Sequence, residues 1–561
     1  MPEISPYKDA KILINERVMM RDRAELATTV YLPLEGDCFP VVLTRTSWNR
    51  ANFRDAALEF VRRGIAFVAQ DVRGRHGSQG HFYPFDSEKN DGLDTLNWLA
   101  EQEWCNQRVG MYGDSYMGAV QFAVAPYNHP LLKALNPRFI PGDTWQCAYY
   151  RDGVYSLGLT FSWLILDVNS PNSEEYLLPL YDVPGVLRQL PLGTLDEKMG
   201  CRPSPAFRNL LKHDTPDEHY DAWRWRDSFS QTTIPTLMTG GWYDYYANDA
   251  FLNFAQLQKS SDPKVAASHR IIVGPWTHGL RYSSELGEFD FGPNATQEDD
   301  HNIRWLDCLL KGGDSESFQK APIRLFVMGE NLWRDEWEWP LTRTQWTPFY
   351  LRASGVLSSQ TPENEAPDEY VYDPDNPVPT TGGNHSVGPW TPGLYEICQV
   401  GPYEQNRVET RDDVLVYTGE VLEEDLEITG PILVKLFAAS SAPDTDWVAR
   451  LCDVYPDGRS FNITEGVIRA LHQKRDWENP ELIEPHKIYE YTIDLHATSN
   501  VFKAGHRLRL QITSSNFPLW ARNLNTGEPY ATGVEMQSAE QTIYHDAAHP
   551  SHIILPIIPR A

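Results

Sequence analysis

The sequence predicts an α/β protein in which a mostly parallel sheet carries helices on its faces, with a helical insertion and a following all-β sandwich. Three observations predict this order. Short apolar runs alternate with helical patterns before residue 140 and again after residue 231, an aromatic-rich stretch broken by prolines separates these parts, and strand-length apolar runs follow residue 390. We therefore expect a core of residues 1–140 and 231–345, a helical insert or cap of residues 141–230, and a sandwich of residues 346–561.

The first part of the core shows strands and helices in alternation. Residues 40–43, 65–69 and 109–112 are apolar runs of strand length. Residues 53–63 have helical spacing and end at Gly64, a typical helix C-cap. A second helical pattern lies between the second and third strands. This alternation is typical of a parallel sheet covered by helices.

The alternation stops after residue 140 and later resumes. Between these parts the sequence has a helical pattern interrupted by Pro171, Pro184 and Pro203, which favours an insertion over further sheet. The core strands expected after it are residues 234–238, 271–273 and 323–327, with a helix over residues 303–310.

After about residue 352 the sequence no longer alternates between strand and helix patterns. A connection over about residues 353–390 is rich in Pro, Gly, Ser and acidic residues, so we expect it to be irregular. The strands expected beyond it are residues 432–437, 448–454, 488–495 and 506–512. A β-sandwich follows from this pattern.

Composition limits the partners of the chain. Its 561 residues include 49 Lys and Arg against 77 Asp and Glu, a formal net charge of −28. Such a charge repels phosphate backbones and anionic lipid, so we expect no nucleic-acid and no membrane partner. No run approaches the roughly 18 apolar residues of a membrane span. The N-terminus does not have the pattern of a secretory signal.

Cysteine usage indicates the cellular compartment, and the motifs of the sequence indicate which cofactors to expect. The seven cysteines are scattered without a C-x-x-C pair, which favours a reducing cytoplasm over a disulfide framework or a zinc cluster. No phosphate-binding glycine loop, H-E-x-x-H pair or Cys/His set is present, so we expect no cofactor and no metal. A small-molecule substrate is the expected partner, and the sequence leaves a homodimer open.

The segment VGMYGDSYMGAV has the pattern of a nucleophile elbow, in which a strand enters a tight turn with one serine and a helix follows. Gly113 suits the turn because a Cβ has no room there, and the turn presents Ser115 Oγ clear of the sheet. The Tyr116 backbone N–H at the helix N-terminus faces any oxyanion formed at the serine. The usual elbow has glycine where Met117 stands, with Gly118 one residue later, so an ordinary strand-to-helix turn is the alternative.

A serine nucleophile needs a base and an orienting acid, which follow it in the order Ser, Asp or Glu, His at strand ends. Asp244 and His278 each follow a predicted core strand. Taken singly, each also fits an ordinary loop residue. Their shared order and position favour a common site. His76 and His81 are rival bases, but both precede Ser115.

Three segments carry a family resemblance: GDSYMG at 113–118, GGWYD at 240–244 and GPWTH at 274–278. They resemble the G-x-S-Y-x-G, G-W-Y-D and G-P-W-x-H segments of the cocaine esterase/X-Pro dipeptidyl-peptidase family of serine hydrolases. Further similar segments lie at 71–82, 324–341, 445–460 and 497–518. The resemblance covers nearly the whole chain and is strongest to the acyl esterases of the family.

The resemblance implies an α/β-hydrolase core, a helical domain inserted into it and a C-terminal jelly roll. It assigns Ser115 as the nucleophile, Asp244 as the orienting acid and His278 as the base. It also implies that the Tyr116 backbone N–H forms part of the oxyanion hole.

The chain departs from the family at one site position. A tyrosine hydroxyl within an R-x-x-Y segment usually completes the oxyanion hole, and here RTSWNR places Trp48 at that position. An indole N–H donates a hydrogen bond but cannot accept one, and it has a different reach from a phenol. Trp48 is therefore either an oxyanion donor or a wall of the pocket.

The expected function is a serine hydrolase that cleaves carboxylic (acyl) esters through an acyl-enzyme. Aromatic residues are the candidates for its substrate pocket, although packing within an aromatic-rich insert explains them equally well. These residues are Tyr149, Tyr150, Phe161, Trp163 and Tyr246.

Two alternatives remain. One is an X-Pro dipeptidyl-peptidase or α-amino acid ester hydrolase on the same scaffold, which needs carboxylates to hold a substrate ammonium. Arg45 and Arg50 beside Trp48 weigh against such an anchor. The other is a non-catalytic glycan-binding protein, in which the jelly roll and the 18 Trp residues bind sugar.

Overall fold

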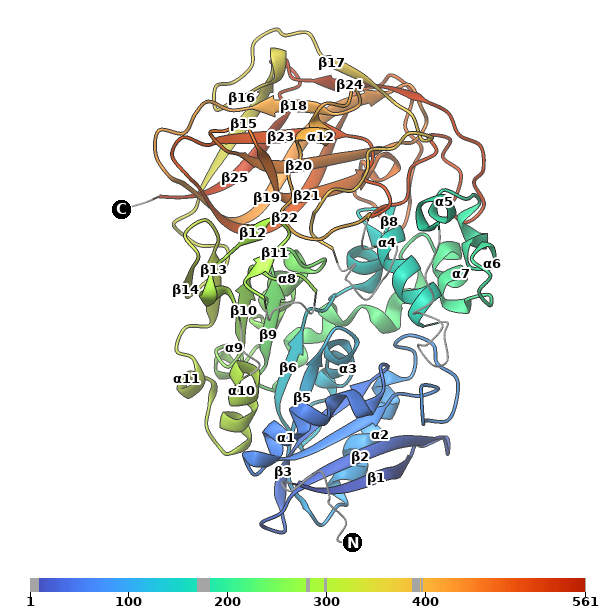
Figure 1. Cartoon of the computed structure of the whole chain (residues 1–561), viewed down its shortest axis with the longest axis vertical. Helices are drawn as coiled ribbons and strands as arrows, with labels where there is room; N and C mark the ends of the chain where they lie inside the picture. Colours follow the sequence, from blue (N-terminus) through green and yellow to red (C-terminus); the bar gives the residue numbers. More distant parts are fainter. Residues whose placement is uncertain are drawn as a thin grey trace.

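The computed structural model describes residues 10–168, 182–278, 283–296, 300–385, 394 and 397–559. An α/β part holds the N-terminus at the bottom of Figure 1, and an all-β part lies above it. A group of short helices lies between them at one side (Figure 1). This is the arrangement that the sequence predicts: a sheet with helices, a helical insertion, and a separate all-β part.

The α/β part is built on one sheet, which has ten strands among the described residues, in the order β1-β2-β4-β3-β5-β6-β9-β10-β13-β14. Neighbours from β4 to β13 are parallel. The edge pairs β1/β2, β2/β4 and β13/β14 are antiparallel. The strands are β1 (Ala10–Met19), β2 (Glu25–Pro33), β3 (Phe39–Thr46), β4 (Ala66–Asp71), β5 (Cys105–Asp114), β6 (Leu132–Arg138), β9 (Leu237–Gly241), β10 (Arg270–Gly274), β13 (Ile323–Val327) and β14 (Leu332–Glu336).

The sequence prediction lacked four of these strands, β1, β2, β6 and β14. In β1 only Ala10 and Val18 are buried, so its sequence lacks the apolar run or the regular alternation of a core strand. Its backbone is nevertheless satisfied by pairing with β2 along the sheet edge.

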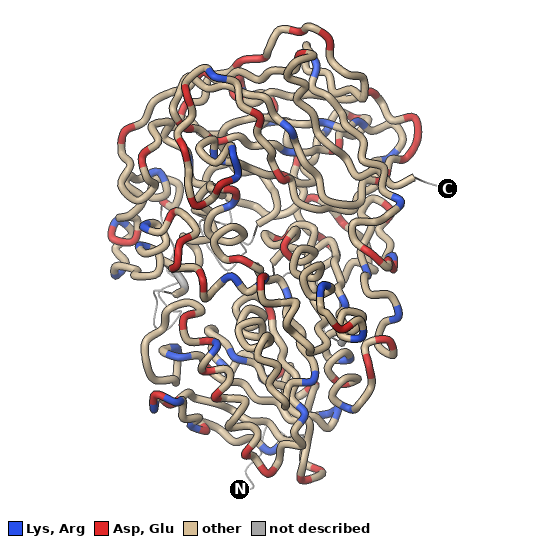
Figure 2. Tube along the Cα trace, turned by 180° about the vertical axis from the view of Figure 1, so that it is seen from behind, with Lys and Arg blue, Asp and Glu red and all other residues tan. Residues whose placement is uncertain are grey.

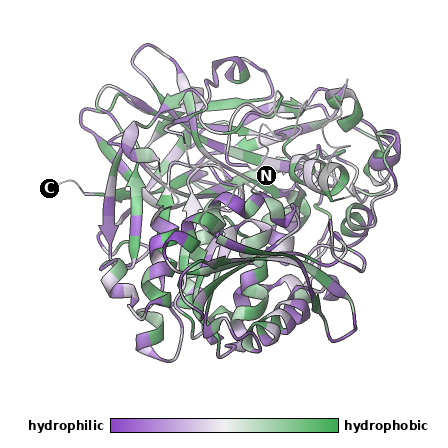
Figure 3. Cartoon of the chain, turned by 60° about the horizontal axis from the view of Figure 1, so that its bottom comes forward, coloured by the Kyte–Doolittle hydropathy of each residue, from purple (hydrophilic) through white to green (hydrophobic). Residues whose placement is uncertain are grey.

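Helices cover both faces of this sheet. Val41 and Leu43 of β3 pack in one hydrophobic cluster with α2 and α3, whereas Val42 packs in another with α1 and α10. Successive strand residues point to opposite faces, so one strand serves both layers. Green apolar and purple hydrophilic stretches alternate along the flanking helices in Figure 3. The helices of this part are α1 (Arg54–Arg62), α2 (Glu88–Ala100), α3 (Tyr116–Val124), α8 (Ala247–Leu257), α9 (Pro263–Ala266), α10 (Asp300–Leu310) and α11 (Ser315–Phe318).

The predicted insert consists mainly of short helical segments. Its α-helices are α4 (Leu157–Thr160), α5 (Val183–Leu187), α6 (Leu195–Lys198) and α7 (Pro205–Lys212), with π-helical turns at Trp145–Tyr149 and Phe161–Asp167. A small hairpin of β7 (Tyr150–Arg151) and β8 (Val154–Tyr155) lies among them. Pro171 lies outside the described residues. The residue limits that we expected for the domains stay predictions.

The all-β part forms a second sheet with eleven strands among the described residues, all paired antiparallel except β16 with β18. Its own apolar core contains Leu351, Ile432, Trp447 and Ile512. The strands are β15 (Gln345–Arg352), β16 (Val356–Ser358), β17 (Asp368–Tyr372), β18 (Leu415–Thr418), β19 (Leu426–Ser440), β20 (Asp446–Val454), β21 (Ser460–Arg469), β22 (Tyr489–Phe502), β23 (Arg507–Thr513), β24 (Ala539–Tyr544) and β25 (His552–Ile558), with a short helix α12 (Asn406–Glu409).

The expectation of an irregular connection over residues 353–390 was wrong in part. This stretch contains β16 and β17, and Tyr370 and Tyr372 of β17 are buried. Because Pro, Ser and acidic residues surround it, the short alternating pattern of β17 does not stand out in the sequence. This strand is stabilised by pairing with β24.

Direct hydrogen bonds join the two parts. Met328, just past β13, donates its backbone N–H to Ser499 O at 2.9 Å and accepts one from Val501 N–H at 2.9 Å. Asn248 of α8 donates its side-chain amide to Asp494 Oδ2 of β22 at 2.9 Å. The all-β part is therefore bonded to the end of the first sheet at which β13 stops.

Charged residues of both signs are spread over the trace in Figure 2, with acidic positions along both parts. All seven cysteines are free thiols. Among the residues that the structure describes, no helix combines the length and the apolar character needed to cross a bilayer.

Replacing Trp305 with alanine should lower the free energy of unfolding by about 3–5 kcal/mol. This side chain of α10 is fully buried, and its indole donates to Leu135 O at 3.0 Å. Chemical denaturation followed by circular dichroism measures the change. Trp337→Ala is the control. Because the Trp337 side chain is 65% exposed, this variant should change the free energy of unfolding by no more than about 0.5 kcal/mol. Equal losses in both variants would contradict this packing.

Candidate active site

Ser115 occupies a sharp turn between β5 and α3. Its backbone has φ 53° and ψ −122°, a strained conformation for a residue with a side chain, and its N–H donates to Arg138 O at 2.8 Å. Gly113 has φ 148°, and a Cβ there would lie 2.3 Å from Met117 Cβ. A Cβ on Gly118 would lie 2.5 Å from Ile140 Cγ2. The sequence therefore supplies glycine at both places where the turn and the helix leave no room.

The N-terminus of α3 lies directly at this turn. Gly118 and Ala119 donate their N–H groups to Ser115 O at 2.9 Å. The earlier amides, those of Tyr116 and Met117, have no acceptor within the helix because a helix offers none to its first N–H groups. Together with the helix dipole, they make this end favourable for a negatively charged oxygen next to Ser115.

Asp244 and His278 are brought together by two neighbouring strands. β9 and β10 run parallel, with Gly241 paired with Gly274, and the loops that follow them carry the two side chains. His278 Nδ1 lies 2.8 Å from Asp244 Oδ2, while Asp244 Oδ1 accepts the Tyr246 N–H at 2.7 Å. The carboxylate is therefore held at both oxygens and can fix the orientation of the imidazole.

β6 connects this pair to the serine turn. Arg138 at its end pairs with Asp114 on one side and Thr239 on the other. The next residue, Phe139, packs its ring edge-on against His278 with centroids 6.1 Å apart. The strand ends after β5, β6, β9 and β10 thus form one edge, where open α/β sheets place their ligands.

The structure does not show a direct bond between the serine and the imidazole. In the described part of the chain, neither Ser115 Oγ nor His278 Nε2 has a hydrogen-bond partner. Both side chains are partly exposed. The Ser115–His278 contact therefore stays a prediction, and catalytic hydrogen bonds often tighten only when substrate binds.

Aromatic rings surround the Tyr116 side chain. Phe85 stacks on it with centroids 4.7 Å apart, and Phe82, Trp48 and Trp163 lie at 5.8, 6.3 and 6.4 Å. The cluster joins the loop after β3, the segment before α2 and the predicted insert. Trp48 and Trp163 are only partly buried, so they can face a ligand.

The other predicted pocket residues have different surroundings. Tyr149 stacks on Trp163 at 6.3 Å, which places it at the edge of the Tyr116 cluster. Tyr246 packs edge-on against His278 at 5.6 Å. Phe161 is fully buried. Tyr150 lies apart, because its ring stacks on Trp145 at 5.6 Å and its hydroxyl donates to Leu210 O at 3.0 Å.

A buried polar network anchors the Tyr116 side chain. Its hydroxyl donates to Glu88 Oε1 at 2.7 Å, and Arg45 reaches Glu88 Oε2 at 2.6 Å. Burial raises the pKa of Glu88, although the Arg45 charge opposes this. Burial, together with the Glu88 charge, also raises the pKa of Tyr116 well above its usual value. Tyr116 can therefore offer the site its backbone N–H, while its phenol is committed to Glu88.

The remaining candidates from the sequence are also accounted for. His76 Nε2 lies 3.1 Å from Ser47 O, and His81 is exposed. Arg45 and Arg50 are both engaged by carboxylates, Glu88 and Asp71 respectively. The carboxylates next to Trp48 in space are therefore paired with arginines.

Sequence reasoning missed three rings that lie close to the site: Phe82, Phe85 and Phe139. Phe82 lies in the segment 71–82, which resembles the family, and Phe139 directly follows β6. The resemblance was a usable signal for Phe82, whereas β6 was not among the predicted strands. Which ring each one faces depends on folded geometry.

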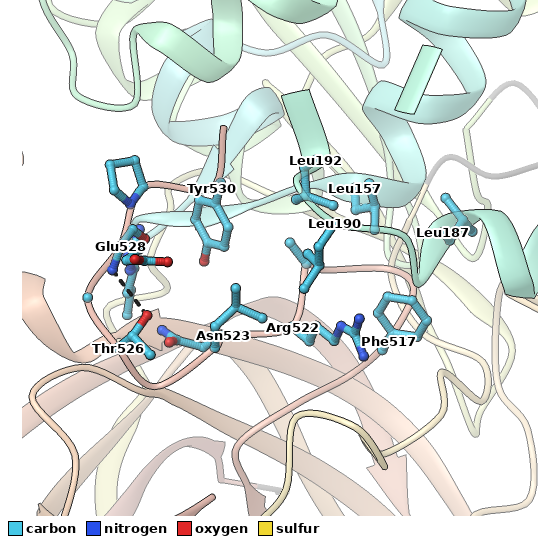
Figure 4. A pocket seen from close by; sticks show the side chains of 15 residues that line it. Leu157, Leu187, Leu190, Leu192, Phe517, Arg522, Asn523, Thr526, Glu528 and Tyr530 are labelled. Carbon is cyan, nitrogen blue, oxygen red and sulfur yellow. Dashed lines mark hydrogen bonds between the residues drawn. The ribbon is translucent and has the colours of Figure 1, made fainter. Parts of the chain in front are cut away.

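Two cavities lie away from these residues. One, of about 10 Å³, enough for about one water, separates leucines of the insert from the all-β part. Figure 4 shows Leu157, Leu190 and Leu192 in its upper part, with Tyr530 to their left and Arg522 below them. The other, of about 430 Å³, has Phe289, Tyr455 and Phe461 among its walls. None of the predicted site residues lines either cavity.

Known proteins are similar to this chain over nearly its whole length. A family described as X-Pro dipeptidyl-peptidase (S15 family) matches residues 22–280, and its C-terminal non-catalytic domain matches residues 317–554. A cocaine esterase of Rhodococcus sp. (strain MB1 Bresler) is 35% identical over 97% of this chain and 98% of its own. A putative serine esterase of Mycobacterium bovis is 26% identical over 96% of this chain and 94% of its own.

Solved structures share the fold over nearly the whole chain. An aminopeptidase from a marine sediment Thaumarchaeota archaeon superposes with a TM-score of 0.87 at 25% identity, covering 98% of this chain and 97% of its own. An α-amino acid ester hydrolase superposes with a TM-score of 0.84 at 24% identity, covering 99% of each chain. The chain therefore belongs to the X-Pro dipeptidyl-peptidase (S15) family, as a serine ester hydrolase with the family's separate C-terminal all-β domain.

Proposed function

We propose that this enzyme cleaves carboxylic esters by two-step acyl transfer, with Ser115 as nucleophile, His278 as base and Asp244 as orienting acid. The observation that carries the assignment is the 2.8 Å contact between His278 Nδ1 and Asp244 Oδ2 at the strand edge that also carries the Ser115 turn. That contact keeps the proton on Nδ1, so Nε2 is free to accept one.

The steps follow from these positions. Ser115 Oγ attacks the ester carbonyl carbon while His278 Nε2 takes its proton, and the tetrahedral intermediate then expels the alcohol, which receives that proton. Water attacks the acyl-enzyme in turn, again giving a proton to His278. The acid leaves and the proton returns to Ser115 Oγ. The reaction thus consumes one ester and one water and needs no cofactor.

The developing oxyanion takes its hydrogen bonds from the Tyr116 N–H and the Trp48 indole. Tyr116 supplies the first because its amide lies at the start of α3 beside Ser115. Trp48 is proposed for the second because it stands where the family has its tyrosine donor, and its ring packs edge-on against Tyr116 with centroids 6.3 Å apart. Here an indole replaces the hydroxyl donor expected in the family.

The substrate pocket is aromatic. Phe82 and Trp163 form its walls beside Tyr116, with Tyr149 stacked on Trp163 and Tyr246 beside His278. Phe161 is fully buried and Tyr150 stacks on Trp145, so neither is assigned to the pocket surface. Such a surface suits an ester with an aromatic or bulky apolar acyl group. The relative named cocaine esterase supports a small-molecule ester as substrate.

Peptidase activity is the second candidate, favoured by the aminopeptidase structure of the same fold. It requires a carboxylate for the substrate ammonium. Two carboxylates near the start of α3, Glu88 and Asp114, are engaged by Arg45 and Arg138. We therefore propose the acyl esterase, and comparing a 4-nitrophenyl ester with a Gly-Pro 4-nitroanilide separates the two.

We further propose a cytoplasmic enzyme whose partners are small esters, with no nucleic-acid or membrane partner. The seven free thiols support the reducing compartment, and the net charge of −28 supports the exclusion of polyanions. A homodimer also stays a proposal, for which light scattering on the purified protein is the direct measurement.

Ser115→Ala should lower kcat on a 4-nitrophenyl ester by about 10⁴-fold or more, because no other described group at the turn offers a nucleophile. Labelling by a fluorophosphonate, located by mass spectrometry, should fall on Ser115 in the unmodified enzyme. Ser268→Ala is the matched control, since that hydroxyl only caps Val265 O at 2.7 Å, and it should keep its activity within about twofold. Turnover retained by Ser115→Ala would refute the nucleophile.

Trp48→Phe should lower kcat by about 10²-fold, because an aromatic ring remains but the indole N–H donor is lost. Trp48→Tyr restores a donor and should recover most of that loss. The two variants are compared on the same ester by steady-state kinetics. If Trp48→Phe retains kcat within about threefold, Trp48 is a pocket wall and the Tyr116 amide acts without it.

A further inference from the structure

One short peptide of the all-β domain touches both loops that carry the proposed acid and base. Asn384 donates its side-chain amide to the backbone carbonyl of Trp242, two residues before Asp244. Thr277, the residue before His278, donates its hydroxyl to His385 O at 2.9 Å. Adjacent residues of one domain thus bond to two loops of another.

These contacts are buried. Asn384 is 6% exposed, and His385, Trp242 and Thr277 are each 2% exposed or less. A buried carbonyl or amide that loses its partner stays unsatisfied, since no water replaces it, and this is unfavourable. The Trp242 carbonyl and the Asn384 amide therefore hold each other in place.

The residue before this peptide is held against the all-β sheet by an isolated bridge and by close packing. Gly383 and Gly401 exchange backbone hydrogen bonds of 2.8 and 3.0 Å. Gly383 has φ 121°, and a Cβ there would lie 2.1 Å from Glu465 Oε1. Glu465 is itself buried and held by Arg450 at 2.8 Å. The backbone just before Asn384 is thus confined against a buried ion pair.

On their opposite side the two loops are bonded to each other. Trp242 N–H donates to Gly274 O at 2.9 Å, and Tyr243 N–H donates to Trp276 O at 3.0 Å. These bonds fix the loops relative to the α/β sheet but leave the Trp242 carbonyl and the Thr277 hydroxyl pointing to the other domain. The all-β domain supplies the partners for both.

We propose that Asn384, together with the His385 carbonyl, is a positioning element for the reaction: the all-β domain clamps the acid and base loops and thereby sets the Asp244–His278 hydrogen bond. This role rests on the proposed triad. Asn384 touches neither the imidazole nor the carboxylate, so it acts through Trp242 and not on substrate. The domain described in the family as non-catalytic would then contribute to kcat through geometry alone.

Asn384→Asp tests the clamp because it keeps the shape and replaces the amide donor by a carboxylate. We expect kcat to fall about tenfold or more and KM to stay within about twofold, since misaligned groups slow the chemical step more than they weaken binding. The matched control is Asn525→Asp. Asn525 is fully buried, donates its amide to Gln537 O at 2.7 Å and, like Asn384, has a side-chain oxygen without a partner in the described chain. Its kcat should stay within about twofold.

A second pair of variants covers the case in which Asn384→Asp does not fold. Thr277→Val removes the hydroxyl and should lower kcat about tenfold, whereas Thr277→Ser keeps it and should retain activity. A direct readout is the low-field proton resonance of the His278 Nδ1–H donated to Asp244, identified by its loss in Asp244→Asn. It should shift or broaden in Asn384→Asp and Thr277→Val and stay unchanged in Asn525→Asp.

Unchanged kcat and an unchanged resonance in Asn384→Asp and Thr277→Val would overturn the clamp, and so would an equal loss of kcat in Asn525→Asp. Neither result bears on Ser115, whose alanine variant tests the proposed reaction separately. If that variant kept its activity, the proposed triad would fail, but the resonance would still decide whether the all-β domain positions the Asp244–His278 pair.

Discussion

The parallel pairing of β9 with β10 is the constraint on which the site depends. Gly241 and Gly274 stand opposite each other at the strand ends, and a Cβ on Gly241 would lie 2.3 Å from Trp276 O. The two loops can therefore leave the sheet in contact. Because of that contact, Asp244 meets His278 although 34 residues separate them. A buried carboxylate needs such partners, since an unpaired charge inside a protein is strongly unfavourable.

The serine turn depends on a different kind of constraint. Ser115 is held with positive φ by the helix behind it and by the Arg138 carbonyl, and glycines on either side leave space for close packing. Strain of this kind persists only where surrounding structure fixes it. The buried Arg45–Glu88–Tyr116 network gives that support beneath the turn. The edge formed by these strand ends is thus fixed near Ser115 by packing and near His278 by strand pairing.

The all-β domain is part of this arrangement and not an appendage. It is bonded to the end of β13 at Met328, to α8 at Asn248, and through Asn384 and His385 to the loops that carry Asp244 and His278. The contacts with the loops lie on the side where the Trp242 carbonyl and the Thr277 hydroxyl take no hydrogen-bond partner from the described residues of the α/β sheet. A fold that buries loop carbonyls between two domains must provide donors from the second domain.

The sequence by itself determined the layers of the fold, the glycines of the serine turn, and the order of Ser115, Asp244 and His278 at strand ends, because periodicity and turn chemistry are local properties of the chain. Among the strands that it missed are the edge strand β1, which pairs with β2, and the short strand β17, which pairs with the distant β24; both are stabilised by pairing more than by an apolar pattern of their own. Only the tertiary structure decided that Asp244 bonds to His278, that Tyr150 faces Trp145, and that Asn384 reaches Trp242. These contacts join residues far apart in the chain, and the physical reason is that side-chain direction across such distances is set by packing and strand register, which no local pattern encodes.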